Sequence, residues 1–163
     1  MVSSESLRSR AWKAASAVAD PEIPVLTIAD LGVLREVRVV GGTVQVTITP
    51  TYSGCPAMRV IEADVAEALR RVGIRDFHIS TTLSPPWTTD WLSVDGRRKL
   101  AEFGIAPPAG SPGRRALFSN DAVPCPHCGS QATERISEFG STACKALFRC
   151  RSCANPFDYF KCH

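Results

Sequence analysis

Histidine is scarce in this sequence, with only three among 163 residues. None stands in a Glu-x-x-His pattern, the helical arrangement through which di-iron carboxylate enzymes bind their metal. The chain also lacks a glycine-rich nucleotide-binding loop and a serine–histidine–aspartate set. These absences argue against direct catalysis, and in particular against an oxygenase active site.

Long apolar segments are also missing, and no run approaches the roughly 20 apolar residues that span a bilayer. Residues 1–20 are amphipathic, with interleaved basic side chains, and lack the apolar core and cleavage site of a secretory signal. The seven cysteines are an odd number, which fits a reducing compartment better than a disulfide framework. We therefore expect a cytoplasmic protein with no membrane partner.

The excess of positive charge is small, a net +3 at pH 7. Residues 1–110 carry 12 basic and 12 acidic side chains, and residues 111–163 carry 7 and 4, so the C-terminal part accounts for the whole excess. Nucleic-acid-binding domains have a much denser Lys/Arg footprint. A nucleic-acid-binding role is therefore the least supported of the functions considered.

The hydrophobic pattern predicts a compact α+β domain over residues 1–105. The hairpin turn is Gly41-Gly42, and Val44, Val46 and Ile48 alternate with polar residues as in a strand with one buried face. The expected elements are a helix over 5–19, strands over 33–40 and 43–49, a helix opened by Pro56 and ended at Gly73, a strand over 74–81 and a helix over 93–103. The first helix is expected to place Trp12 on its apolar side.

Residues 106–124 are rich in Pro, Gly and Arg and are expected to form a linker. Residues 125–163 are then too few for an independent core, so a bound metal must supply much of their stability.

Two Cys-x-x-Cys pairs in this tail, Cys125 with Cys128 and Cys150 with Cys153, have the spacing of a ribbon that closes a tetrahedral thiolate site. Four sulfur ligands leave no open coordination position, so the site is expected to be structural, with zinc favoured over iron. His127 lies inside the first pair and is expected at the surface rather than as a ligand. Strands are expected over residues 146–149 and 157–160.

Three further cysteines remain. Cys144 is expected at the tip of the ribbon turn and Cys162 is the penultimate residue. Each is either an ordinary buried or idle thiol or, together with Cys55, part of a second, exposed sulfur site.

Cys55 precedes Pro56 at the expected start of a helix, where unpaired backbone N–H groups and the helix dipole favour a thiolate. The alternative is a small apolar side chain packed under a turn. No histidine lies within a few residues to act as a base, so a protease-like nucleophile is poorly supported.

Two other segments have alternative interpretations. Asp20 and Glu22 lie in an Asp-Pro-Glu sequence typical of a turn, with an Asp-Leu-Gly sequence ten residues later. Trp87 and Trp91 lie in a Pro-rich loop and are either lids of the core or anchors for a partner protein.

Residues 5–105 resemble the small iron–sulfur assembly domain of SufT-like proteins and MIP-type cytosolic targeting factors. The resemblance depends on three motifs, Asp20-Pro21-Glu22, Asp30-Leu31-Gly32 and Thr51-Tyr52-Ser53-Gly54-Cys55-Pro56. With the four-cysteine tail and the segments over residues 87–91 and 157–163, the whole chain resembles the PaaD (also called PaaJ) family of bacterial phenylacetate degradation.

This resemblance implies an α+β assembly-type domain followed by a zinc-ribbon module. It implies a non-catalytic accessory role toward the oxygenase and reductase components that epoxidise phenylacetyl-CoA, in the assembly or repair of their iron or iron–sulfur centres. It makes Cys55 the candidate thiol that handles iron or a cluster, with Asp20 and Glu22 in the associated motif. The alternative function is a structural or interaction subunit of the same complex, and a homodimer that pools two Cys55 thiols is a further expectation.

Overall fold

The computed structural model describes residues 3–108 and 123–161. Contacts divide the chain into two units, Met1–Trp87 and Thr88–His163. The α+β class predicted from the sequence is confirmed. The placement of the domain boundary at residue 105 stays a prediction, and most of the expected linker, 106–124, lies outside the described residues.

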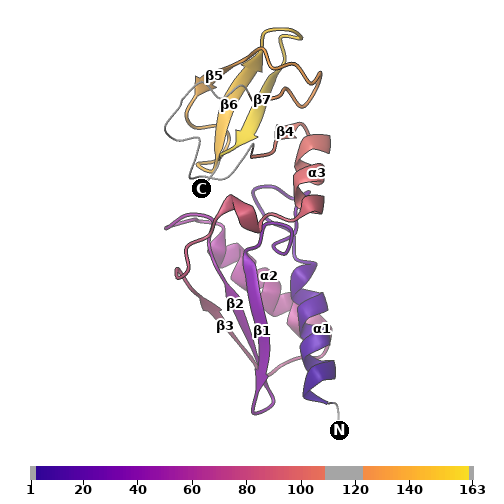
Figure 1. Ribbon diagram of the computed structural model, residues 1–163. Helices are drawn as coiled ribbons and strands as arrows, with labels where there is room; N and C mark the ends of the chain where they lie inside the picture. Colours follow the sequence, from indigo (N-terminus) through magenta and orange to yellow (C-terminus); the bar gives the residue numbers. More distant parts are fainter. Residues whose placement is uncertain (1–2, 109–122, 162–163) are drawn as a thin grey trace. The chain divides into compact units, whose positions relative to one another are not determined.

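The first unit contains a three-stranded sheet of order β1-β2-β3 with two helices (Figure 1). Strands β1 (Leu34–Val40) and β2 (Thr43–Ile48) form the predicted antiparallel hairpin. Helix α2 (Met58–Arg71) then leads to β3 (Phe77–Thr81), which pairs with β2 in parallel. Helix α1 (Ser4–Ser16) packs against β1 and α2.

The core of this unit follows the predicted apolar pattern of β2 and α2. The side chains of Val44, Val46 and Ile48 are fully buried, whereas Gln45 is exposed. On α2 the buried residues are Ile61, Val65 and Leu69, one side of the helix. The α2 helix ends near the predicted stop at Gly73, where φ is +78°.

Helix α1 differs from its prediction. Its buried positions are Ala11 and Ala15, one turn apart, and Trp12 is 42% exposed. The expectation that Trp12 faces the core is therefore wrong. Because small alanine side chains face the sheet, the helix backbone can approach it closely, and the indole lies to the side.

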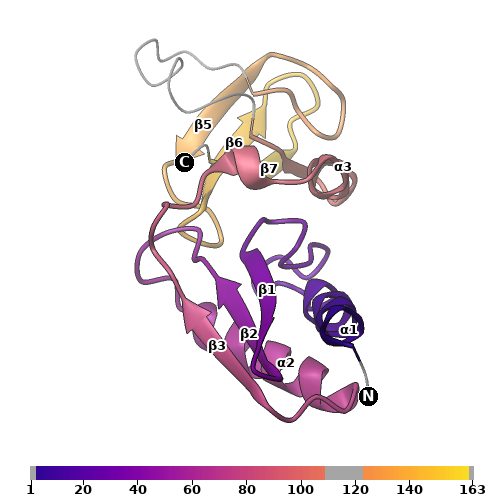
Figure 2. The ribbon, with the colours of Figure 1, turned by 60° about the horizontal axis from the view of Figure 1, so that its bottom comes forward.

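The second unit contains a short 3₁₀ turn η1 (Thr89–Trp91), helix α3 (Val94–Glu102) and a four-stranded sheet of order β4-β7-β6-β5. Ser93 caps α3 by accepting a hydrogen bond from the Gly96 amide at 2.8 Å. Figure 2 shows α3 beside this sheet. Its strands are β4 (Ile105–Ala106), β5 (Thr133–Ser137), β6 (Lys145–Cys150) and β7 (Pro156–Phe160).

Strands β6 and β7 lie where the sequence predicted them, and β6 pairs with both β5 and β7 in antiparallel fashion. The two-residue strand β4, parallel to β7, was not predicted. Seven buried residues form the core of this sheet: Ala106, Val123, Cys125, Ala146, Phe148, Cys150 and Phe157. Two of the seven are members of the cysteine pairs, so this small core and the expected metal site are built from the same residues.

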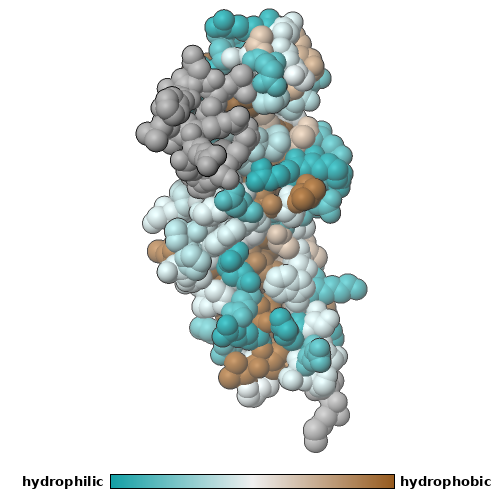
Figure 3. Space-filling view, viewed as in Figure 1, coloured by the Kyte–Doolittle hydropathy of each residue, from teal (hydrophilic) through white to brown (hydrophobic). Residues whose placement is uncertain are grey.

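The face of the molecule seen in Figure 3 is largely hydrophilic or intermediate, with apolar side chains in small patches. Isolated exposed apolar residues of this kind are normal for a folded protein. Within the described ranges, no helix has the length and apolar character needed to cross a membrane.

Candidate functional site

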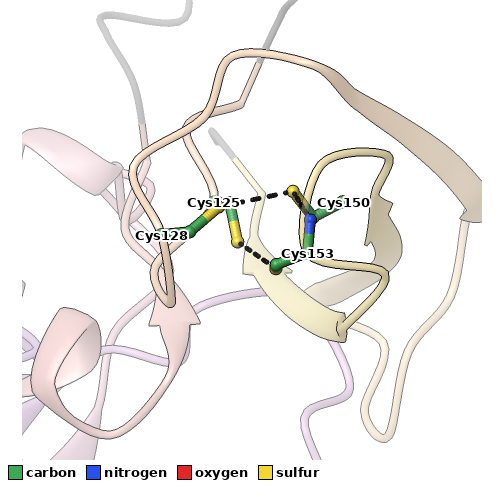
Figure 4. A group of neighbouring side chains, drawn as sticks. All are labelled: Cys125, Cys128, Cys150 and Cys153. Atoms are coloured by element: carbon green, nitrogen blue, oxygen red, sulfur yellow. Dashed lines mark hydrogen bonds between the residues drawn. The ribbon is translucent and has the colours of Figure 1, made fainter.

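Four thiols converge in the second unit. The sulfurs of Cys125, Cys128, Cys150 and Cys153 lie within 4.8 Å of one another, and Figure 4 shows them meeting from two loops. Cys125 Sγ lies 3.8 Å from Cys153 Sγ, and Cys128 Sγ lies 3.6 Å from Cys150 Sγ. A tetrahedral ion with Zn–S bonds of about 2.3 Å requires sulfurs roughly 3.8 Å apart. The donor set and its spacing therefore fit one tetrahedral ion.

The two cysteine loops share one backbone geometry. In each, the first cysteine amide donates to the carbonyl five residues further along, at 2.9 Å from Cys125 and 3.0 Å from Cys150. In each, the residue after the second cysteine has a positive φ, +74° at Gly129 and 63° at Ala154. Ala154 holds a conformation that costs a residue with a Cβ about 1 kcal/mol. The second loop accepts this cost and matches the geometry of the first.

Backbone amide groups of the two loops donate hydrogen bonds to the sulfurs and so change the pKa values of the thiols. Hydrogen bonds from the Cys153 and Ser152 amides lower the pKa of Cys150 to about 6. The Ser130 amide acts in the same direction on Cys128, but the neighbouring thiols, first among them Cys150, raise the pKa of Cys128 to about 12. Protons and a metal ion therefore compete for this cluster, and acid favours the protons.

Of the other tail residues, His127 is exposed, as the sequence predicted. Cys144 lies just before β6 and is 4% exposed, with Sγ 3.0 Å from Thr142 Oγ1. Of the two alternatives left open for it, the buried thiol is therefore confirmed and membership of an exposed sulfur site is wrong. Cys162 lies outside the described residues. The imidazole ring of His127 lies against Gly104. A Cβ added at Gly104 would lie 3.2 Å from Cε1 of that ring.

Cys55 lies in the loop between β2 and α2, three residues before the first residue of the helix, Met58. The prediction that Pro56 opens the helix is therefore wrong by two residues. The Cys55 amide donates to the Tyr52 carbonyl at 3.2 Å, and its own carbonyl accepts from the Met58 amide at 3.4 Å. These two bonds hold the half-buried thiol in a turn that leads into α2.

The Cys55 loop borders an open hollow of about 650 Å³. Its lining is mostly apolar, with Leu83 59% exposed, and contains one cation, Arg59. Volumes of this size accommodate small molecules or a segment of another protein. The lining residues are Pro50, Ser53, Gly54, Cys55, Pro56, Met58, Arg59, Thr81 and Leu83.

Burial raises the pKa of the Cys55 thiol above its usual value. A hydrogen bond from the Ala57 amide favours the thiolate, as the sequence predicted, but the negative charges of Glu22 and Asp20 add to the effect of burial. The expectation of a ready thiolate is therefore wrong, because loss of solvent outweighs the amide. Glu22 and Asp20 do lie near enough to act on the Cys55 thiol.

These three residues do not form a metal cage by themselves. Within residues 3–108 and 123–161, the four tail cysteines are the group whose ligand atoms converge closely enough to hold an ion. Asp20 is 7% exposed, and its Oδ1 accepts from the amides of Glu22 at 2.9 Å and Ile23 at 2.8 Å. Asp20 thus holds the turn that carries Glu22, in line with the turn interpretation of this motif.

The two tryptophans have different environments. Trp87 is 5% exposed, and its indole N–H donates to the Leu31 carbonyl at 2.8 Å. It is a core side chain of the first unit and presents no exposed ring to a partner. Trp91 is partly exposed in the 3₁₀ turn of the second unit, and its docking role stays a prediction.

We expect Glu22→Gln to speed the reaction of Cys55 with iodoacetamide at pH 8 by roughly two- to fivefold. Loss of the nearby negative charge lowers the pKa of the thiol, so a larger fraction is thiolate. Mass spectrometry of the Cys55 peptide measures the rate. Glu67→Gln, which removes a carboxylate paired with Arg71 on α2, is the control and leaves it unchanged. An unaltered rate in Glu22→Gln would contradict the electrostatic link.

Comparisons with known proteins agree with both units. Residues 8–76 match the family "Iron-sulfur cluster assembly protein", and residues 109–161 match the "PaaD zinc beta ribbon domain". A protein of Escherichia coli (strain K12), named as a putative subunit of 1,2-phenylacetyl-CoA epoxidase, is 50% identical over 151 residues, covering 93% of this chain and 90% of that protein.

Two further proteins match part of the chain. An "Fe-S protein maturation auxiliary factor" of Porphyromonas gingivalis (strain ATCC BAA-308 / W83) is 39% identical over 85 residues, covering 51% of this chain and 80% of that protein. The crystal structure of a DUF59 domain of unknown function from Bacillus anthracis has a TM-score of 0.55 at 26% identity, covering 60% of this chain and 93% of that one.

Proposed function

The chain belongs to the PaaD family, together with the putative epoxidase component of E. coli, and we propose that it is a non-catalytic accessory factor of a phenylacetyl-CoA epoxidase. In this proposal it assists the assembly or repair of iron or iron–sulfur centres in the oxygenase and reductase components. The relative named as an Fe-S protein maturation factor supports this role for the first unit.

The observation that carries the proposal is the setting of Cys55. A single half-buried thiol, with Glu22 and Asp20 close by, borders a hollow that is open to solvent. One soft ligand is too few to keep an ion, so cargo here needs further ligands from another molecule and is released when they leave. The acidic neighbours favour a cation, and binding of iron would displace the proton from the thiol.

The ribbon has the opposite character. Four thiolates close the coordination shell, so the ion, which we propose is zinc, has no position for a substrate and serves to hold the fold. In this proposal the protein binds two kinds of ion. A transient ion binds at Cys55, and a permanent structural ion is held by Cys125, Cys128, Cys150 and Cys153. A homodimer that brings two Cys55 thiols together is one way to complete the transient site.

The test is Cys55→Ser, co-expressed with the oxygenase and reductase components. We expect those components to lose most of their iron, measured by anaerobic metal analysis and by the absorption and EPR spectra of their centres. Ser53→Ala, which changes the same hollow without removing the thiol, is the control. Full iron loading with Cys55→Ser would refute the proposed role.

The second candidate is a structural component whose ribbon docks on the other proteins of the complex. Exposed Ile136 and Phe139, at 53% and 63%, favour it, because apolar side chains of this size are common anchors at interfaces. An adaptor tolerates Cys55→Ser but loses co-purification when both side chains are changed to serine. Co-purification of each variant with the epoxidase components therefore separates the two functions.

A further inference from the structure

The four metal-binding cysteines are not equally accessible. Cys128 is solvent-exposed, whereas Cys125 and Cys150 are 2% and 0% exposed and Cys153 is intermediate. A metal ion held between the sulfurs covers only their inward side. Cys128 is therefore the member of the cluster that an external reagent reaches most readily.

The chemistry of the cluster adds to this difference. A metal-bound thiol is deprotonated, and the thiolate is the form that reacts with peroxides and alkylating agents. The Cys150 sulfur is both buried and engaged by the amides of Ser152 at 3.4 Å and Cys153 at 3.5 Å. These two donors withdraw electron density from Cys150, whereas Cys128 has one such amide donor, that of Ser130. Burial and the second amide therefore protect the Cys150 thiolate more, while Cys128 stays exposed.

We propose that Cys128 is an oxidation site through which a peroxide releases the metal of the ribbon. In the first step the Cys128 thiolate attacks one oxygen of hydrogen peroxide. The S–O bond forms, the O–O bond breaks, and the leaving hydroxide takes a proton from solvent to become water. The product is a sulfenic acid at Cys128.

The second step needs a thiolate in contact with that sulfur, and Cys150 supplies it, with Sγ 3.6 Å from Cys128 Sγ. Attack by Cys150 forms the S–S bond and breaks the S–O bond, and the second hydroxide leaves as water after protonation. Two electrons pass from two thiolates to the peroxide, which becomes two molecules of water. Only Cys125 and Cys153 then remain as ligands, and two thiolates do not complete a tetrahedral zinc shell.

The consequence is a ribbon whose stability depends on the redox state of its surroundings. The disulfide ties the two cysteine loops together but removes the ion that both loops were shaped to bind. Reduction by a thiol restores the four ligands, so the change is reversible while the oxidation stops at the disulfide.

The experiment uses the zinc-loaded full chain. Limiting N-ethylmaleimide followed by peptide mapping is expected to label Cys128 at least about tenfold faster than Cys125 or Cys150. Hydrogen peroxide is expected to release one zinc ion for each Cys128–Cys150 disulfide, followed with a chromogenic zinc chelator and non-reducing peptide maps. Labelling that reaches Cys125, Cys150 or Cys153 before Cys128 would overturn the proposal.

Cys128→His keeps a fourth metal ligand and removes the accessible thiol, so we expect zinc to stay bound and its release by peroxide to slow about tenfold. Cys153→His makes the same ligand exchange at the equivalent position of the second loop and retains Cys128. Peroxide is expected to release zinc clearly faster from Cys153→His than from Cys128→His. Equal rates in the two variants would overturn the proposal, and if neither variant holds zinc, the order of labelling in the unmodified chain decides.

Discussion

Removing zinc is expected to unfold the four-stranded sheet of the second unit, while the first unit stays folded. The sheet has a core of seven residues, and two of them, Cys125 and Cys150, belong to the group of four cysteines that could hold a metal ion. Structural zinc in modules of this size contributes about 10–16 kcal/mol of apparent binding free energy near neutral pH. The remaining apolar contacts, chiefly Phe148 with Phe157 and Tyr159, are too few to replace it.

Hydrogen exchange before and after chelation measures the effect segment by segment. Amides of β5, β6 and β7 should lose protection together, and those of β2 and α2 should keep it as an internal control. A sheet that stays protected after complete loss of metal would contradict the assignment of a structural ion.

Acid should produce the same unfolding. Metal binding requires thiolates, and Cys150, with a pKa of about 6, gives up its proton far more readily than Cys128, with a pKa of about 12. Binding therefore weakens as the pH falls and the thiols of higher pKa take up protons, and it is lost as the pH falls through the pKa of Cys150, the value at which that ligand is protonated too. Zinc release followed from pH 8 to pH 4 tests the direction.

Asp20→Ala is expected to destabilise the first unit by roughly 2–4 kcal/mol. Asp20 Oδ1 accepts two amide hydrogen bonds, from Glu22 and Ile23, and alanine leaves both donors without this partner in a largely buried turn. Thermal or urea unfolding measures the loss. Because the turn carries Glu22, the reactivity of Cys55 should change as well.

Asp20→Asn is the matched variant. Its side-chain oxygen still accepts from both amides, so the expected loss of stability is only about 1 kcal/mol. The pair separates two roles of Asp20. A turn role predicts that iron loading of the epoxidase components follows stability and is kept in Asp20→Asn, whereas a direct role toward iron predicts equal loss in both variants.

Local patterns predicted much of this architecture. The alternation of Val44, Val46 and Ile48 and the apolar stripe of Ile61, Val65 and Leu69 depend only on the repeat of a strand or a helix, so neighbouring residues contain the information. The cysteine quartet was predictable for a similar reason, since two residues between cysteines set the geometry of each loop. The two ribbon strands predicted from the sequence, over residues 146–149 and 157–160, agree with β6 and β7 to within one residue at each end.

The features that the sequence left open, missed or predicted wrongly depended on residues far apart in the chain. Trp87 is buried because its indole reaches Leu31, 56 positions earlier. Trp12 is exposed because Ala11 and Ala15 face the sheet instead. The two-residue strand β4 exists only because β7, about 50 residues later, offers an edge to pair with.

Sequence alone determined the cysteine quartet, the order of helices and strands in the first unit and the family, because each is encoded in short-range spacing or in short sequence motifs. Tertiary structure decided the state of the individual thiols. Burial raises the pKa of Cys55 and removes Cys144 from solvent, whereas Cys128 stays exposed. The state of each of these thiols depends on how much solvent the rest of the fold excludes from it. Solvation is a property of the packed chain, so no local pattern contains it.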